Sequence, residues 1–385
     1  MKTLLISNDF PPVVSGISTV FYYVWKNLPK EENIILAPNV NGSLVFDRKN
    51  NLQVTRYPYL TPNSIFPKLI NNLLMFLYIL PFVPRVDGLH CGQILSSGVC
   101  GLIFKKLFKK PYFLWAYGGE TTPVYIKSRW SKFLVEKILD NANIIFTNSK
   151  FTSKEFLDYG IPREKIIEII PAVDCKIFKP LPKCSDLVEK LKIKEKKTIL
   201  TISRLAERKG HDIVLKALPL VLKSVPDLNY LIVGDGPYKT YLMELCQELK
   251  LNNVVTFFGF AHDEDLVMYY NLCDVFVMPN REIFNSTDSV EGFGITFIEA
   301  NACNKPVIGG RSGGAIEAVK DGVTGFLVDS QNVKEVAHKI ISLLQNEELA
   351  KKMGEEGRRR AERDFSWEKR AYEMIEQLEQ KTLKT

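Results

Sequence analysis

The sequence predicts an α/β protein with two Rossmann-like, doubly wound domains that face a cleft. At 385 residues the chain is too long for a single hydrophobic core. Short apolar runs alternate with helical patterns, which is typical of parallel sheets. The alternation occurs twice, and a proline- and lysine-rich linker with a short helix, Lys176–Lys197, separates the two series. We therefore expect an N-terminal domain over 1–176 and a C-terminal domain over 177–365.

The apolar runs in each series have the length of strands. The first series comprises Lys2–Ser7, Ile34–Ala37, Gly88–Gly92, Pro111–Tyr117, Asn143–Asn148 and Ile166–Pro171. The second comprises Thr198–Ser203, Asn229–Val233, Val254–Phe258, Asp274–Met278, Pro306–Ile308 and Phe326–Val328. Helical patterns lie between most of these runs, and the strongly charged stretch Val333–Leu383 is expected to be helical throughout.

The composition is that of a soluble enzyme, with 46% apolar and 25% charged residues. The seven cysteines are scattered and form no Cys-x-x-Cys pair, which indicates reduced thiols in the cytosol. The four histidines show no ligand spacing, which argues against zinc. The apolar stretch at the N-terminus is too short for a signal peptide and is interpreted as the first strand.

The net charge of +7 suits a nucleic acid, an anionic membrane or an anionic substrate. The basic residues are dispersed and show no RNA-binding signature, which argues against nucleic acid. The run Leu73–Leu80 is unbroken apolar but falls short of the ~20 residues of a spanning helix, so a buried helix and a membrane contact both stay open. The segment Phe104–Lys110 alternates aromatic residues with lysines, which favours a membrane surface over a solvated helix end.

Glu291 and Glu299 are the most informative pair of residues. Glu291 stands beside Gly292 and Gly294, which allow close backbone approach to a ligand. A helix is expected to open there, with free N–H groups suited to phosphate and with Glu299 about one turn inside. The alternative is a surface turn followed by an amphipathic helix.

Two further loops follow predicted strands. In Asp9–Ile17, Gly16 is positioned for backbone contact with a phosphate just before a helix near Ser18, although a proline-rich turn explains the same pattern. In Ser203–Gly210, we expect Arg204 and Lys209 to point into the cleft toward phosphate oxygens and Arg208 to point outward. A basic loop capped by glycine is the alternative.

The next two strands are also followed by glycine-containing turns. Gly234, Asp235 and Gly236 suit the wall of a nucleotide pocket, since the third glycine of an NAD fingerprint is absent. Phe258 and Phe260 provide a surface on which a base can pack. The acidic triplet Asp263–Asp265 resembles a metal-binding motif. However, it precedes an apolar helical run and fits the first turn of a helix better.

Taken in order, these motifs resemble those of glycosyltransferase family 4, whose members are retaining enzymes with the two-domain GT-B fold. The resemblance is strongest from about Leu200 to Val328, and Lys305–Ile308 and Ser312–Gly314 extend it. It is weaker over 1–175. It implies that the last helix, 366–385, crosses back to the N-terminal domain.

The resemblance also implies roles for individual residues. Arg204 and Lys209 would clamp the diphosphate of a nucleotide sugar, Gly16 would contact it from the N-terminal domain, and Glu299 would bind the ribose. Glu291, with the backbone of Phe293, Gly294 and Ile295, would hold the sugar and phosphates. Transfer would proceed by front-face attack, with the leaving phosphate taking the acceptor proton. No cofactor and no divalent metal would be needed.

The chain departs from the family pattern in three places. Tyr117, in Trp115–Glu120, stands where the family has a histidine that meets the donor sugar; a phenol donates a hydrogen bond but is no base near neutral pH. Ser15 precedes Gly16 where the family has a glycine pair. The segment Asn280–Val290 is long, as in members that resemble phosphatidylinositol and exopolysaccharide mannosyltransferases.

The expected function is therefore transfer of a hexose, with mannose from GDP-mannose favoured, to a lipid-linked or polysaccharide acceptor at the cytoplasmic face of the cell membrane. The expected partners are this donor, this acceptor and an anionic membrane surface. UDP-sugar-dependent transfer of glucose or N-acetylglucosamine, a catalytically silent nucleotide- or glycan-binding subunit, and a GT-B epimerase are the alternatives.

Overall fold

The computed structural model describes residues 1–29, 34–61, 64–123, 126, 128–283 and 289–382. It divides into two compact units. Unit 1 comprises Met1–Pro171 and Trp367–Thr385, and unit 2 comprises Ala172–Ser366. The boundaries expected from the sequence lay at 176/177 and 365/366.

Unit 1 is built on a parallel sheet of seven strands in the order β3-β2-β1-β4-β5-β6-β7. Its strands are β1 (Thr3–Ile6), β2 (Ile34–Asn39), β3 (Val54–Pro58), β4 (Gly88–Cys91), β5 (Tyr112–Ala116), β6 (Ile144–Thr147) and β7 (Ile166–Glu168). Its helices are α1 (Gly16–Lys26), α2 (Ser43–Lys49), α3 (Ile65–Ile79), α4 (Ser97–Phe108), α5 (Arg129–Asn141), α6 (Lys150–Asp158) and α15 (Trp367–Thr382), with the 3-10 turns η1 (Leu80–Arg85) and η2 (Arg163–Lys165).

The predicted strands of the first series are confirmed, and β3 was missed. β3 is an edge strand whose side chains are mostly half-buried, so it lacks the continuous apolar run of a central parallel strand. The C-terminal helix α15 packs within unit 1. The Trp367 ring stacks on Tyr23 of α1 with 5.3 Å between ring centroids, and Ala371, Met374 and Leu378 are buried.

Unit 2 has a parallel sheet of six strands in the order β10-β9-β8-β11-β12-β13. Its strands are β8 (Lys197–Ile202), β9 (Leu228–Val233), β10 (Val255–Gly259), β11 (Val275–Met278), β12 (Val307–Gly310) and β13 (Gly325–Val328). Its helices are α7 (Ser185–Leu191), α8 (His211–Val221), α9 (Lys239–Glu248), α10 (Leu266–Leu272), α11 (Ile295–Ala302), α12 (Ala315–Ala318), α13 (Val333–Gln345) and α14 (Glu347–Asp364), with the 3-10 turns η3 (Glu207–Lys209) and η4 (Asp263–Asp265).

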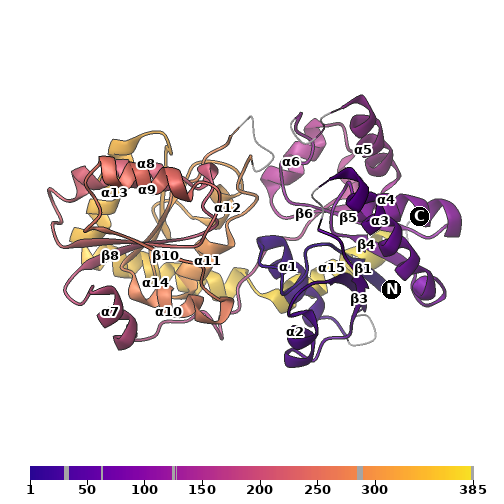
Figure 1. Ribbon diagram of the computed structural model, residues 1–385, viewed down its shortest axis with the longest axis horizontal. Helices are drawn as coiled ribbons and strands as arrows, with labels where there is room; N and C mark the ends of the chain where they lie inside the picture. The colour runs from indigo at the N-terminus through magenta and orange to yellow at the C-terminus, as the bar shows by residue number, and fades with distance from the viewer. Residues whose placement is uncertain (30–33, 62–63, 124–125, 127, 284–288, 383–385) are drawn as a thin grey trace. The chain divides into compact units, whose positions relative to one another are not determined.

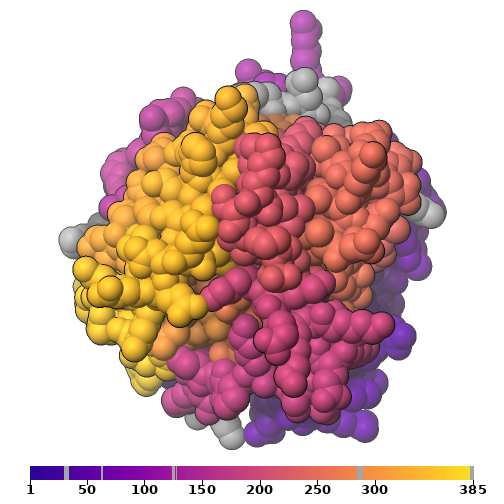
Figure 2. Space-filling model, turned by 90° about the vertical axis from the view of Figure 1, so that its left-hand side faces the viewer, coloured from indigo at the N-terminus to yellow at the C-terminus, as the bar shows by residue number. Residues whose placement is uncertain are grey.

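The helices of unit 2 form two layers. α8, α9 and α13 cover one face of the sheet, and α10, α11 and α14 lie on the other (Figure 1). α13 packs against α8, and Figure 2 shows the two segments side by side on the surface. The stretch Val333–Leu383 is helical over nearly all of its described length, as expected. It forms three helices, because the chain breaks at Asn346, which caps α14, and again at Phe365 before α15. Leu383 itself lies outside the described residues.

The order of strands in unit 2 locates the binding region. β9 and β10 extend the sheet on one side of β8, whereas β11, β12 and β13 extend it on the other. The connections therefore reverse direction between β8 and β11. In open parallel sheets, ligands bind at the carboxyl ends of the strands at such a switch point.

Candidate functional site

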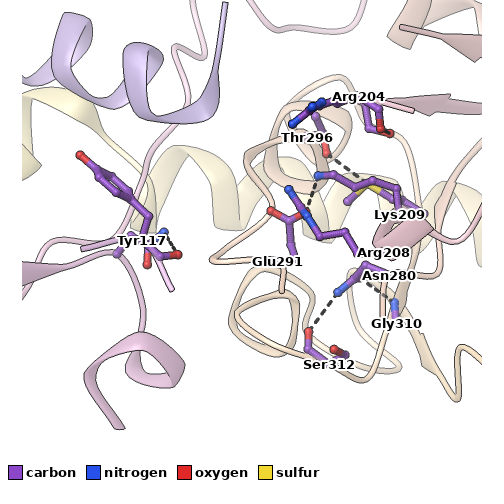
Figure 3. Close-up of polar contacts among 12 residues, drawn as sticks. Tyr117, Arg204, Arg208, Lys209, Asn280, Glu291, Thr296, Gly310 and Ser312 are labelled. Atoms are coloured by element: carbon purple, nitrogen blue, oxygen red, sulfur yellow. Dashed lines mark hydrogen bonds and ion pairs between the residues drawn. The ribbon is translucent and has the colours of Figure 1, made fainter. Parts of the chain in front are cut away.

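The loops that follow β8 and β11 meet at the switch point of unit 2. The loop after β8 carries Arg204, Arg208 and Lys209, and the loop after β11 leads to Glu291. The two loops are joined directly, because the Arg281 N–H donates to the Arg208 carbonyl at 2.8 Å. Figure 3 shows Arg208 and Lys209 at Glu291, with Arg204 farther off beside Thr296 of α11. Residues from two loops that are distant in the sequence thus form one cluster.

Glu291 is the centre of this cluster. Its Oε2 accepts hydrogen bonds from Lys209 Nζ and, at 2.8 Å, from Arg208 Nη1. All three side chains are largely buried, with exposed fractions of 11% for Glu291 and Lys209 and 14% for Arg208. The prediction that Arg208 points outward was therefore wrong. Its guanidinium turns inward because the Glu291 carboxylate, on the other loop, accepts its hydrogen bond.

The two cations control the charge of Glu291. Burial alone would raise the pKa of this carboxyl, but the Lys209 ammonium and the Arg208 guanidinium more than offset burial and hold the pKa at about 2. Glu291 is therefore a carboxylate at neutral pH. Arg204 lies earlier on the same loop and is exposed to solvent.

The loop after β11 is fastened by a residue that sequence reasoning missed. The fully buried Asn280 amide accepts the Gly310 N–H at 3.0 Å and donates to the Ser312 carbonyl at 3.1 Å. It thereby ties the end of β11 to the end of β12. Arg281, next in the chain, pairs with Asp212 at 2.9 Å. Both residues come just after an apolar strand, β11, and its Pro279, and that position was the signal that could have found them. Residues 284–288 of the long segment Asn280–Val290 lie outside the described residues.

The start of α11 has the backbone geometry expected of a phosphate cradle. Gly294 is the N-cap residue and has φ of 92°, a left-handed conformation that favours glycine. The N–H groups that open this helix, from Ile295 on, have no carbonyl one turn before them within the helix. Phe293 contributes only backbone, since its side chain is buried and lies against Phe365 with 5.8 Å between ring centroids.

Glu299 lies one turn inside α11, as predicted. It is buried, and it accepts a hydrogen bond from the Tyr270 hydroxyl at 2.7 Å. Burial raises the pKa of the Glu299 carboxyl to about 7, against the lowering effect of the Tyr270 hydroxyl. The two carboxylates of the segment therefore differ: Glu291 is ionised, and Glu299 titrates near neutrality.

The turn after β9 packs against the loop after β8. A Cβ atom at Gly234, whose φ is 136°, would lie 2.0 Å from the Ser203 carbonyl oxygen. Asp235 is exposed, accepts the Gly236 N–H at 2.7 Å and pairs with Lys239 at 3.0 Å. These residues thus lie beside the basic loop, where the wall of a nucleotide pocket was expected.

The two phenylalanines at the end of β10, Phe258 and Phe260, have different surroundings. The Phe258 ring packs on Tyr269 with 4.8 Å between centroids and lies under the Lys190 ammonium. Phe260 is 53% exposed and contacts the His262 ring. Phe260 therefore has the freer ring face. Asp263–Asp265 form η4 directly before α10, so the expected place at the start of a helix is confirmed.

The predicted residues of unit 1 lie at the carboxyl ends of its strands. Gly16 is exposed and is the first residue of α1, two residues earlier than expected, with Ser15 as the N-cap that accepts the Ser18 N–H at 3.0 Å. Tyr117 directly follows β5. Burial raises the pKa of the Tyr117 phenol well above its ordinary value, and its buried hydroxyl has no hydrogen-bond partner among the described residues. The phenol is therefore neutral and keeps an unused hydrogen-bond donor.

Two carboxylates that were not predicted hold the loop of Tyr117. Glu120 accepts the Tyr117 and Gly118 N–H groups at 2.6 and 2.7 Å. Glu155 accepts the Gly119 and Thr121 N–H groups at 2.7 and 3.0 Å. Burial, together with the nearby Glu155, raises the pKa of Glu120 to about 7. Within the described residues, no group of three or more His, Cys, Asp or Glu side chains could hold a metal ion.

The fold and the site define a class. Two Rossmann-like units, one with a basic loop, an ionised glutamate and an open helix start at its switch point, are typical of GT-B glycosyltransferases. The crystal structure of Anabaena HepE in complex with UDP and glucose matches with a TM-score of 0.83 over 98% of this chain and 99% of that chain, at 20% identity. Sucrose-phosphate synthase from Thermosynechococcus elongatus matches with a TM-score of 0.80 over the whole of both chains, at 21% identity. These likenesses confirm the predicted fold.

The sequence comparisons identify the family. The model "Glycosyltransferase Family 4" matches residues 14–177, and "Glycosyl transferases group 1" matches residues 185–360. The GDP-mannose-dependent alpha-(1-6)-phosphatidylinositol monomannoside mannosyltransferase of Mycobacterium tuberculosis is 33% identical over 397 residues, covering 98% of each chain. A related monoacylated-acceptor mannosyltransferase of Corynebacterium glutamicum is 28% identical over 95% of each chain. The chain belongs to glycosyltransferase family 4 and is a glycosyltransferase.

Proposed function

We propose that this enzyme transfers mannose from GDP-mannose to a lipid-linked acceptor of the phosphoglycolipid kind, with retention of configuration and without a divalent metal. The observation that carries the proposal is the full-length similarity to the Mycobacterium tuberculosis enzyme, whose name specifies both this donor and such an acceptor. The proposed site of action is the cytoplasmic face of the cell membrane, where a nucleotide sugar from the cytosol meets an acceptor anchored in lipid.

The residues of unit 2 suit a nucleoside diphosphate. The N–H groups at the start of α11 and the cations of Arg204 and Lys209 supply positive charge for two phosphates. As the sugar leaves, charge grows on the leaving diphosphate, and donors already in position stabilise it without reorganisation. These groups do what a metal ion does elsewhere, which is the basis for proposing metal independence.

The two glutamates then have separate roles. Glu299 accepts hydrogen bonds from the ribose hydroxyls, for which its Tyr270 partner holds the carboxyl in place. Glu291, held as a carboxylate by Arg208 and Lys209, faces the sugar and the positive charge that develops on it. Gly16 contributes backbone N–H contact to the phosphates. Tyr117, as a neutral phenol, donates a hydrogen bond to the sugar and does not act as a base.

The remaining steps follow from this arrangement. The acceptor hydroxyl attacks on the face from which the diphosphate leaves, and the departing phosphate oxygen takes its proton. Gly234, Asp235 and Gly236 line the nucleotide, and the exposed ring of Phe260 offers a face for the guanine. Phe258, two residues earlier, packs on Tyr269.

Thermal-shift measurements with GDP and UDP, followed by transfer from radiolabelled GDP-mannose to a lipid extract, test the proposal. We expect GDP to raise the unfolding temperature more than UDP, because a ligand stabilises the state that it binds. Arg204→Ala should abolish transfer, and Lys223→Ala, an exposed cation beyond α8, should not. A larger shift with UDP, or transfer from UDP-sugars alone, would overturn the choice of donor.

A further inference from the structure

Helix α3 in unit 1 presents an apolar face to solvent. Along one side of the helix, Phe66 is 72% exposed, Leu69 61%, Leu73 58% and Leu77 48%. The opposite side, with Met75 and Ile79, is buried. A soluble protein rarely leaves so long an apolar stripe uncovered, so the stripe indicates a binding surface.

The stripe continues across the neighbouring helices. α4 packs against both α3 and α5, and Figure 1 shows the three helices close together. On their solvent sides, Leu107 of α4 is 62% exposed and Trp130 of α5 is 82% exposed, with Ile103 and Phe133 beside them in the chain at one helical turn. We call the exposed apolar side chains of these three helices the α3–α5 surface.

The charges around this surface are mostly positive. α3 and α4 contain no acidic residue, and their exposed cations are Lys68 and Lys106. Lys109 and Arg129, at the adjoining helix ends, are exposed too. α5 adds the exposed Lys132 and Lys137, against the exposed Asp140 and the Glu136 carboxylate, which pairs with Lys132 at 3.8 Å. Two of the lysines in the predicted membrane-binding segment Phe104–Lys110 are held by other parts of the protein and are not free to meet lipid headgroups. Lys105 Nζ donates to the Asn141 carbonyl at 2.7 Å, and Lys110 Nζ donates to the carbonyls of Val83 and Val86, also at 2.7 Å.

The partner is a lipid surface rather than a second copy of the chain. In a two-fold dimer the same surface meets itself, which would bring the cations of both copies together. Anionic lipid headgroups complement the cations, and the bilayer interior accepts the leucines. Trp130, with an amphipathic ring, is the residue type enriched at the boundary between headgroups and hydrocarbon.

The helix lies on the membrane and does not cross it. Within the described residues, Ile65–Arg85 is the one helical stretch long and apolar enough for a span, with mean hydropathy 1.5. However, α3 alone is about 22 Å long, shorter than the ~30 Å hydrocarbon layer. The buried Asn71 side chain also fastens it to the Leu60 backbone at 2.9 and 2.7 Å. Only its outer face is therefore available to lipid.

We propose that the α3–α5 surface docks unit 1 on an anionic bilayer, with α3 parallel to the membrane plane and its leucines inserted. This inference rests on the proposed function for its purpose, because docking would bring the enzyme to an acceptor anchored in lipid. The docking itself requires only the exposed side chains.

Co-sedimentation of the full-length protein with vesicles tests the docking. Vesicles of phosphatidylcholine with phosphatidylglycerol are compared with vesicles of phosphatidylcholine alone. We expect binding to the anionic vesicles, and a loss on the order of tenfold or more in the combined variant Leu69→Ser, Leu73→Ser, Leu77→Ser. Trp130→Ser with Phe133→Ser should weaken binding in the same direction.

The matched control is Tyr241→Ser with Met243→Ser, two exposed apolar side chains on α9 of unit 2, which should leave binding unchanged. Unchanged binding by the α3 variant, or no binding by the unaltered protein, would overturn the proposal. A protein that is dimeric in solution and becomes monomeric in the α3 variant would assign the surface to self-association instead. Thermal shifts with GDP, measured without vesicles, report on the proposed function separately, and the α3 variant should keep them.

Discussion

Replacing Glu291 with glutamine tests the centre of the site, because the change removes a charge and keeps the shape. The pKa of Glu291 is lowered from 4.5 to about 2. A shift of that size corresponds to about 3 kcal/mol of stabilisation of the ionised form at neutral pH. Since the three side chains are no more than 14% exposed, solvent screening takes little of this away. We therefore expect Glu291→Gln to lower the free energy of unfolding by about 3 kcal/mol at pH 7.

The stability that ionised Glu291 contributes should fall as the pH is lowered. A carboxyl whose folded-state pKa is lowered contributes stability that is fully present above its unfolded pKa of 4.5 and is lost as the pH falls toward 2. The difference between the two proteins should thus shrink by more than half at about pH 3. Urea unfolding followed by far-UV circular dichroism measures it. The four tryptophans all lie in unit 1, so their fluorescence serves as an internal control for that unit.

A difference in stability that is equal at both pH values, or no difference at pH 7, would refute the charge-pair reasoning. The same variant separates binding from turnover. Its Arg204 and Lys209 are still present to meet the diphosphate, so GDP should stabilise Glu291→Gln at least as well as it stabilises the unaltered enzyme, while transfer falls. Loss of the GDP shift together with unchanged turnover would show that Glu291 serves the nucleotide instead.

Glu299→Gln should stabilise the ligand-free protein at pH 8, because burial raises the pKa of Glu299 to about 7 and its ionised form is costly there. In urea unfolding, this gain in the free energy of unfolding should grow between pH 4.5 and 7. Glu299→Ala should weaken GDP binding more than it lowers turnover. Asn280→Ala should lower the free energy of unfolding by about 2 kcal/mol in the same assay, since it leaves two buried backbone groups unsatisfied, and equal stability would contradict the role of this amide. Gly234→Ala should disturb the loop after β8 and reduce GDP binding in a thermal shift, because its Cβ would meet the Ser203 carbonyl at 2.0 Å. Glu120→Gln should flatten the pH profile of transfer near pH 7, where this buried carboxyl titrates. An unchanged profile would show that another group causes the pH dependence.

The sequence by itself determined the elements and the places where chemistry was to be sought. Buried parallel strands are continuous apolar runs, so their positions were readable, and the rule that ligands bind where such strands end pointed to Arg204, Lys209, Glu291 and Glu299. The exception was β3, whose edge position leaves it half-buried and without that signal.

Only the tertiary structure decided which way loop side chains point and what they meet. Arg208 turns inward because Glu291, far along the chain, accepts a hydrogen bond from its guanidinium. Lys105 and Lys110 turn away from solvent because carbonyl groups of other segments accept hydrogen bonds from them. The exposed face of α3 was likewise undecidable, since an apolar helix has the same sequence pattern whether a neighbour covers it or a membrane does. Periodicity is a local property of the chain, whereas side-chain direction and burial depend on contacts between segments that are distant in sequence.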